Sequence, residues 1–231
     1  MHLSYDFSRL CATALLLVLA AGCGTLRPAA TPQPAFYSLD DSGIAARAAT
    51  RSPATSSPRG PTLIVNPPHA VSGYDSQRII YVREAHKLEY FARSEWVDTP
   101  ARMVAPLIVA ALESGGAFRT VMLTPSAATG DLRLDTEITR LDHDFASQPS
   151  RVRFTLRAWL VDNRTRRILA SRQFDETVAA TNETPYGGVV AANRAVQTVL
   201  EHRADSCAEA AANWHPSGAE VPKPIEAPFG R

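Results

Sequence analysis

The chain has 231 residues and carries 24 Lys and Arg against 23 Asp and Glu, a net charge of +1 at pH 7. A balance this close to neutral gives no general attraction to nucleic acid or to anionic lipid, so no nucleic-acid partner is expected. The cysteines are Cys11, Cys23 and Cys207. The pattern of the first 23 residues predicts that Cys11 is removed with a signal peptide and that Cys23 carries a lipid. Cys207 then has no partner for an intramolecular disulfide, so the stability of the fold depends on its hydrophobic core.

The chain begins with an apolar run from Leu10 to Ala21 that ends on Ala-Ala-Gly-Cys at residues 20–23. The run is too short to span a bilayer, which takes roughly 20 apolar residues, but it has the length of the apolar part of a signal peptide. The small residues and the cysteine resemble the bacterial lipobox, although Ala20 stands where Leu is usual. We predict cleavage between Gly22 and Cys23 and acyl chains such as palmitate on Cys23. The alternative is a plain signal peptide with an incidental cysteine.

The residue after the predicted anchor indicates the compartment. It is Gly24 and not Asp, which by resemblance to lipoprotein sorting in a Gram-negative cell favours the outer membrane, with the protein facing the periplasm. Composition then divides the chain: a signal peptide over residues 1–22, a lipidated Ala/Pro/Thr-rich tether over 23–34, one domain over 35–215, and a disordered Pro-rich tail over 216–231. A domain of about 180 residues can bury a single core.

Four strands and a helix are predicted in the first half of the domain. The strands are "AFYSLD" from residue 35, "TLIVNPP" from 62, "RIIYVRE" from 78 and "KLEYFARSEW" from 87, with a loop over 41–61. The helix lies in "DTPARMVAPLIVAALESGG" from residue 98, where Asp98 or Thr99 can cap it, Pro100 suits the first position and two glycines close it. Pro106 predicts a kink.

Period-two patterns return in the second half. "FRTVML" from residue 118 is a strand, and "DLRLDTEITRL", "RVRFTLRAWLV" and "RRILASRQFDET" follow at short intervals, which predicts an antiparallel meander. A long helix runs from Tyr186 to Trp214, with Val189, Ala192, Val196, Val199 and Arg203 along one side. The predicted fold class is mixed α/β (α+β): a central mixed sheet of about five to seven strands, with a C-terminal antiparallel meander, packed by two main helices.

Patterns that carry catalysis or metal chemistry are missing from the sequence. The six histidines include no His-Glu-x-x-His pair, and neither a cysteine pair for zinc, a Gly-x-Ser-x-Gly turn nor a glycine-rich phosphate loop after a strand is found. In "LDHDF", Asp142 and Asp144 face away from His143 in a strand, so we interpret the segment as a solvated strand end rather than a metal site. The sequence predicts a protein without enzymatic activity, metal or cofactor.

Arginines crowd the predicted hairpin at residues 151–172. Arg153 and Arg157 share the outer face of their strand, and Asp135 and Glu137 on the neighbouring strand can sit opposite them, each pair contributing about 0.2–1 kcal/mol. A sheet surface covered by ion pairs is the favoured interpretation. The alternative is a face that meets an acidic protein partner or lipid headgroups.

A second candidate contact surface is the turn "SGYDSQR" at residues 72–78, which presents Tyr74, Asp75 and Arg78. Trp96, just before the first helix, joins it because Tyr and Trp are enriched in binding hot spots. The alternative is that Tyr74 closes the edge of the core and Trp96 packs under the helix.

Together, the lipobox at Cys23, "FYSL" at 36–39, "GYDSQRIIYVRE" at 73–84, "LEYFARSEWVDTP" at 88–100 and "ALESGGAFRTV" at 111–121 resemble the ABC-type transport auxiliary lipoprotein family. The resemblance runs from Phe36 to Trp214; Ser76, where a Leu-like residue is common, and the Pro-rich tail depart from it. It implies a non-enzymatic outer-membrane lipoprotein that serves an ABC permease and ATPase together with a mammalian-cell-entry-domain protein that moves lipids between membranes. It also makes a homo-oligomer conceivable. Two other classes stay open: an outer-membrane assembly lipoprotein that binds a barrel protein, and a secreted hydrolase with an unrecognised site.

Overall fold

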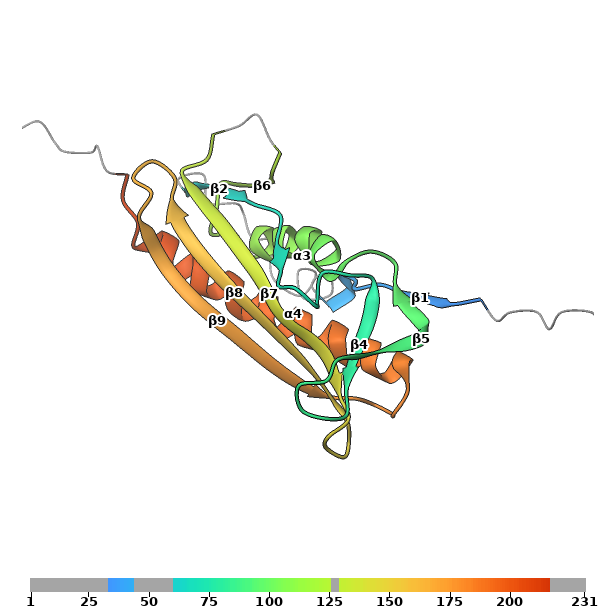
Figure 1. Cartoon of the computed structure of the whole chain (residues 1–231). Helices are drawn as coiled ribbons and strands as arrows, with labels where there is room; N and C mark the ends of the chain where they lie inside the picture. Colours follow the sequence, from blue (N-terminus) through green and yellow to red (C-terminus); the bar gives the residue numbers. More distant parts are fainter. Residues whose placement is uncertain (1–32, 44–59, 126–128, 217–231) are drawn as a thin grey trace, which may run out of the picture. The chain divides into compact units, whose positions relative to one another are not determined.

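The computed structural model describes residues 33–43, 60–125 and 129–216 (Figure 1). Gly22, Cys23, the signal peptide, all but the end of the tether, most of the predicted 41–61 loop and nearly all of the C-terminal tail lie outside the described residues. A compact unit that begins at Pro34 contains every helix and strand named below.

One mixed sheet of nine strands forms the framework of the described part. The strands are β1 Ala35–Tyr37, β2 Thr62–Val65, β3 His69–Ala70, β4 Arg78–Val82, β5 Glu89–Trp96, β6 Thr120–Leu123, β7 Leu132–Asp144, β8 Arg151–Asp162 and β9 Ile168–Ala179. The sequence predicted five to seven strands; the excess includes the two-residue β3, which is too short to leave a period-two pattern.

Strand β7 organises the sheet because both of its edges are used. On one edge, β8 pairs antiparallel with β7, and β9 pairs antiparallel with β8, which confirms the predicted meander. On the other edge, three short strands pair parallel with β7 in succession along its length: β2, β3 and β4. Beyond them, β6 pairs with β2, β5 with β4, and β1 with β5.

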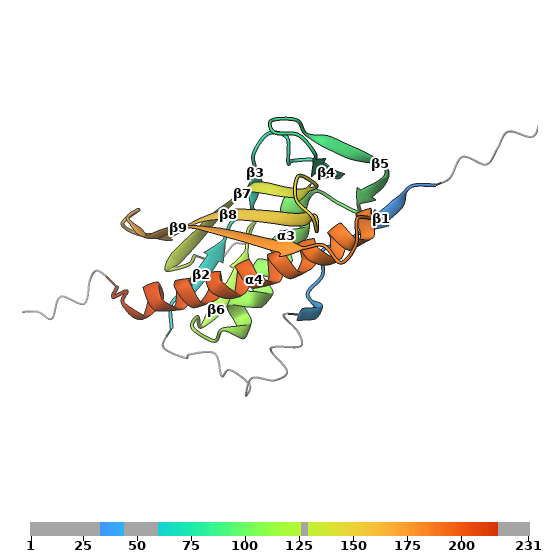
Figure 2. The same cartoon turned by 90° about the horizontal axis from the view of Figure 1, so that it is seen from below.

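Within the described residues, the long helices that pack on the sheet are α3 over Pro100–Ser114 and α4 over Pro185–Ala212. Both predicted helices are therefore confirmed. Figures 1 and 2 show α4 running along one face of the meander, and no described helix covers the opposite face. Pro106 lies inside α3, and Thr99 occupies its N-cap position without a side-chain cap bond. No helix among the described residues is long and apolar enough to cross a membrane.

The core follows the period-two pattern of the long strands. The inward-facing residues are Leu132, Leu134, Ile138, Val152, Phe154, Leu156, Ala158 and Leu160, all buried as predicted. The alternation of β7 changes at a bulge between Ile138 and Arg140, after which Leu141 takes the inward position opposite Phe154. On α4 the predicted side of Val189, Ala192, Val196, Val199 and Arg203 is buried against this surface. The hydrophobic pattern of the sequence thus correctly predicted both the fold class and the buried face of these elements.

Candidate functional site

Tyr74 belongs to the core and not to the surface. Its side chain is 8% exposed, and its hydroxyl donates a hydrogen bond to Asp142 Oδ2 at 2.8 Å. Arg140 Nε lies 3.0 Å from the same carboxylate oxygen. Burial beside this carboxylate raises the pKa of Tyr74 to about 12. Of the two interpretations left open by the sequence, the structure supports the one in which Tyr74 closes the edge of the core.

Trp96 is also a core residue, 3% exposed at the end of β5. It and Tyr74 therefore offer no exposed contact surface, and we do not retain them as direct contacts for a partner. The interpretation of "LDHDF" as a solvated strand end is wrong: Asp142, His143 and Asp144 are all buried. Asp142 is covered by the turn that carries Tyr74, whereas His143 lies so close to α4 that a Cβ at Gly188 would be 2.4 Å from its Nδ1 atom.

Asp75, Arg78, Leu88 and Tyr90, which we call the β5 patch, are exposed on and beside this turn. The Arg78 guanidinium lies over the Tyr90 ring, 4.3 Å from its centroid. The Tyr90 side chain is 50% exposed and that of Leu88 is 42% exposed. A guanidinium stacked on a half-exposed tyrosine, beside an exposed leucine, is the residue chemistry enriched in binding hot spots.

The turn approaches Leu88 closely because it contains a glycine. Gly73 has φ +97°, and a Cβ there would lie 3.3 Å from Leu88 Cδ1. The backbone geometry favours glycine, since other residues rarely adopt this φ. At the other end of the turn, the Trp96 amide donates to the Gln77 carbonyl at 2.7 Å, and Gln77 Nε2 donates to the Val97 carbonyl at 2.9 Å. The turn is thus fixed to β5.

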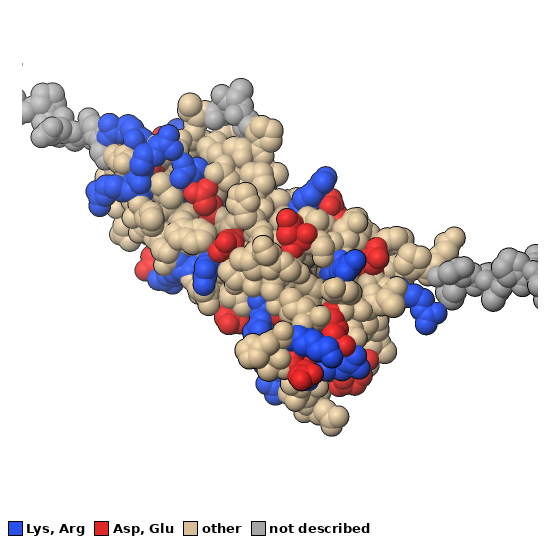
Figure 3. Space-filling model, in the orientation of Figure 1, with Lys and Arg blue, Asp and Glu red and all other residues tan. Residues whose placement is uncertain are grey.

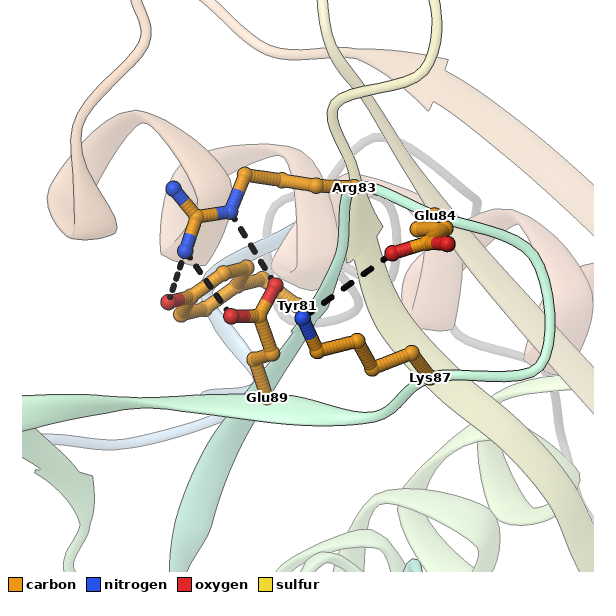
Figure 4. Close-up of polar contacts among 5 residues, drawn as sticks. All are labelled: Tyr81, Arg83, Glu84, Lys87 and Glu89. Atoms are coloured by element: carbon orange, nitrogen blue, oxygen red, sulfur yellow. Dashed lines mark hydrogen bonds and ion pairs between the residues drawn. The ribbon is translucent and has the colours of Figure 1, made fainter.

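The tip of the β4–β5 hairpin is held by charged side chains (Figure 4). Arg83 reaches both carboxylate oxygens of Glu89, from Nε at 3.0 Å and from Nη2 at 2.8 Å, and Nη2 also donates to the Tyr81 hydroxyl at 3.1 Å. These bonds hold the pKa of Glu89 below its ordinary value. Lys87 and Glu84 form a looser pair at 3.9 Å. The contacts fix the strand from which Tyr90 projects.

Aromatic rings support the hairpin near the end of β7. The Tyr81 and Phe91 ring centroids lie 4.6 Å apart, and Phe145 lies 5.8 Å from Tyr81 and 4.1 Å from the His143 ring. Aromatic pairs at these separations contribute beyond their buried area. The β5 patch therefore lies on a hairpin that is packed against the centre of the sheet.

A groove of about 450 Å³ lies between β1 and the first turns of α4. Phe36 and Tyr186 are exposed at its sides, and the Tyr37 and Tyr186 rings are 6.4 Å apart. Asn193 ties the segment just after β1 to the helix, because its side-chain amide donates to the Ser38 carbonyl at 3.1 Å and accepts from the Asp40 amide at 2.9 Å. The groove therefore lies beside β1, the first strand of the described domain.

The outer face of the meander carries the predicted arginines in ion pairs. Arg153 lies 2.7 Å from Asp144, and Arg157 lies 3.6 Å from Glu137, its partner in the β7–β8 register. The Arg157–Glu137 pair confirms part of the prediction, but Asp135 lies opposite Trp159 and pairs with Arg133 of its own strand. Figure 3 shows positive and negative groups intermingled on this face. By contrast, the β8–β9 turn presents exposed Arg164, Arg166 and Arg167, where Figure 3 shows positive charge gathered at one end.

Comparison with known protein families identifies the family of this chain. Residues 37–204 match the family described as the ABC-type transport auxiliary lipoprotein component, which is most of the chain. The chain belongs to this family. A comparison with curated proteins finds no match.

Solved structures share the fold. Protein XCC0632 from Xanthomonas campestris, assigned to family DUF330, matches with 22% identity and a TM-score of 0.60 over 68% of this chain and 90% of that one. A second structure, titled only as an uncharacterized protein, matches with 11% identity and a TM-score of 0.60 over 76% and 99% of the two chains. At these identities the likeness establishes the fold alone. The matched family is one of transport auxiliary lipoproteins and is not a family of enzymes.

Among the described residues, no three His, Cys, Asp or Glu side chains come together to hold a metal ion. Sequence reasoning had identified Asp75 and Arg78 but missed Tyr90 and Leu88. The signal was present, because Leu88 and Tyr90 alternate with Glu89 in "KLEYFARSEW". Both faces of that strand carry apolar residues, however, and only the pairing of β5 with β4 and β1 decides which side chains remain exposed.

Proposed function

We propose that this family member is an outer-membrane lipoprotein that docks the periplasm-spanning mammalian-cell-entry-domain protein of a lipid-moving ABC transport system. The permease and ATPase of that system supply the energy, and this chain supplies a fixed contact surface. Family membership supports the transport role. The observation that supports docking is the β5 patch, where the Arg78 guanidinium is stacked on exposed Tyr90.

The anchor limits where this surface can act. With Cys23 acylated, the tether over residues 23–34 spans at most about 40 Å when fully extended. Strand β1, which follows the tether, pairs with β5, so the chain enters the domain beside the strand that carries Tyr90. Two or more acyl chains hold such a protein stably at a membrane. Mass spectrometry of the native protein should find Cys23 as its first residue with a lipid mass attached; an unmodified Cys23 in membrane fractions would remove the anchor.

The docking surface can be tested by affinity capture from detergent-solubilised membranes of the native cell. The wild-type protein should retain the transporter components, and the Tyr90→Ala/Arg78→Ala double variant should lose most of them, since truncated hot-spot residues each cost about 2 kcal/mol or more. Arg157→Ala is the matched control: it removes an exposed arginine that is already paired with Glu137. Equal capture by the double variant and the wild type would exclude the β5 patch. Capture of a barrel protein in place of transporter components would favour the assembly-lipoprotein alternative.

A further inference from the structure

Arg203 lies on the buried side of α4 with its charge unpaired. The residue is 1% exposed, and its Nε, Nη1 and Nη2 atoms have no hydrogen-bond partner among the described residues. A guanidinium has five N–H donors and stays protonated in proteins. A buried charge without a partner is strongly destabilising. A group that neutralised the Arg203 charge would therefore stabilise the folded state.

No acidic side chain in the described part of the chain supplies that neutralisation. Among the described titratable groups, the one that interacts electrostatically with Arg203 is the Cys207 thiol, one helical turn further along α4. Burial raises the pKa of the Cys207 thiol, so the thiol remains neutral near pH 7 and brings no negative charge. The guanidinium therefore faces apolar and neutral groups.

The same residues border a small, partly open cavity. Arg203, Ser206 and Cys207 line a cavity of about 10 Å³ between α4 and the meander, which is room for about one water-sized sphere. Phe174 and Leu160 are among the apolar side chains of its wall. Arg172 also lines it, but its exposed guanidinium lies 3.8 Å from the Glu209 carboxylate. The cavity thus combines one unpaired guanidinium, that of Arg203, with Ser206 and apolar walls, and none of its lining residues is acidic.

We propose that this cavity binds one small monovalent anion of halide size, held chiefly by the Arg203 guanidinium, with Ser206 as a further donor. A water molecule can accept hydrogen bonds from Arg203 but cannot neutralise its charge. The bound anion links the C-terminal half of α4 to the meander and stabilises the folded state. Chloride is the probe of choice, because the space has no room for a bulky anion such as gluconate.

Urea unfolding of the mature chain in sodium chloride and in sodium gluconate at equal ionic strength tests the site. An anion that binds only the folded state lowers the unfolding equilibrium constant about elevenfold when its concentration is ten times its Kd. We expect a saturable increase in the unfolding midpoint with chloride, and the same with bromide. Arg203→Met, which keeps the side-chain volume without the charge, should abolish the response. Arg102→Gln, at an exposed arginine paired with Asp98, should retain it.

Equal midpoints in chloride and gluconate would overturn the proposal, as would a full chloride response in Arg203→Met. A response to formate but not to chloride would also contradict it, since it would assign the site to a carboxylate. Should Arg203→Met fail to fold, crystals grown in bromide decide independently. An anomalous peak beside Arg203 supports the site, and a water molecule there without anomalous signal refutes it.

Discussion

The hydrogen bond between Tyr74 and Asp142 provides a sharp test of the conclusion that Tyr74 is structural. In Tyr74→Phe the buried ring is retained, so the hydrophobic contribution is unchanged, and only the 2.8 Å bond to the carboxylate is lost. Asp142 is itself buried and keeps Arg140 as a partner. Hydrogen bonds to charged groups contribute about 1.5–3 kcal/mol. We therefore expect the free energy of unfolding to fall by about 2 kcal/mol.

Equilibrium urea unfolding followed by circular dichroism measures this loss. With a slope of about 1–3 kcal/mol per molar urea, the midpoint should fall by about 1 M while the slope stays constant. Capture of the transporter should be unchanged, in contrast to Tyr90→Ala, which should keep the midpoint and lose capture. An unchanged midpoint in Tyr74→Phe would refute the energetic argument, and loss of capture without loss of stability would return Tyr74 to the contact surface.

Two further predictions concern the meander and its end. Leu156→Asp places a charge at a fully buried position and should cost more than about 4 kcal/mol, whereas Arg157→Asp loses an exposed pair with Glu137 and should cost about 1 kcal/mol or less; equal urea midpoints would contradict the assigned strand faces. Burial lowers the pKa of His143 below its ordinary value, although Glu183 and Asp144 oppose this. The unfolded chain therefore takes up a proton near pH 6.5 that the folded chain resists, so His143 reduces stability as the pH falls through this range. In His143→Gln, the loss of unfolding free energy between about pH 7.5 and pH 5.5 should be smaller than in the wild type; an equal loss would exclude His143 as the cause.

Much of the fold could be predicted because its long elements bury one face along their whole length. Strand β8 alternates from Val152 to Leu160, and α4 repeats its apolar side over several turns, so their types and faces followed from period alone. The pairing of β2, β3 and β4 along the second edge of β7 could not be predicted, since parallel pairing of short strands depends on contacts distant in sequence.

The candidate site was harder to predict from the sequence, because it too depends on contacts between residues distant in the chain. Whether Tyr74 is buried depends on Asp142, which follows it by 68 residues. The lack of a partner for Arg203 likewise could not be predicted from the sequence, in which Arg203 is simply a charged residue within an apolar helix face. The pairing of Arg157 with Glu137 could be predicted, because both belong to consecutive strands of one meander and the hairpin fixes their register.

The docking role is tested most directly by site-specific photo-cross-linking in the native cell. A photoreactive amino acid replaces Tyr90 in one strain and Arg153, on the ion-paired face, in another. The proposed function predicts a cross-link from the Tyr90 position to the periplasm-spanning component of the transporter, and little or none from the Arg153 position. Cross-links of equal strength from both positions, or none from the Tyr90 position in a strain that retains transport, would contradict it.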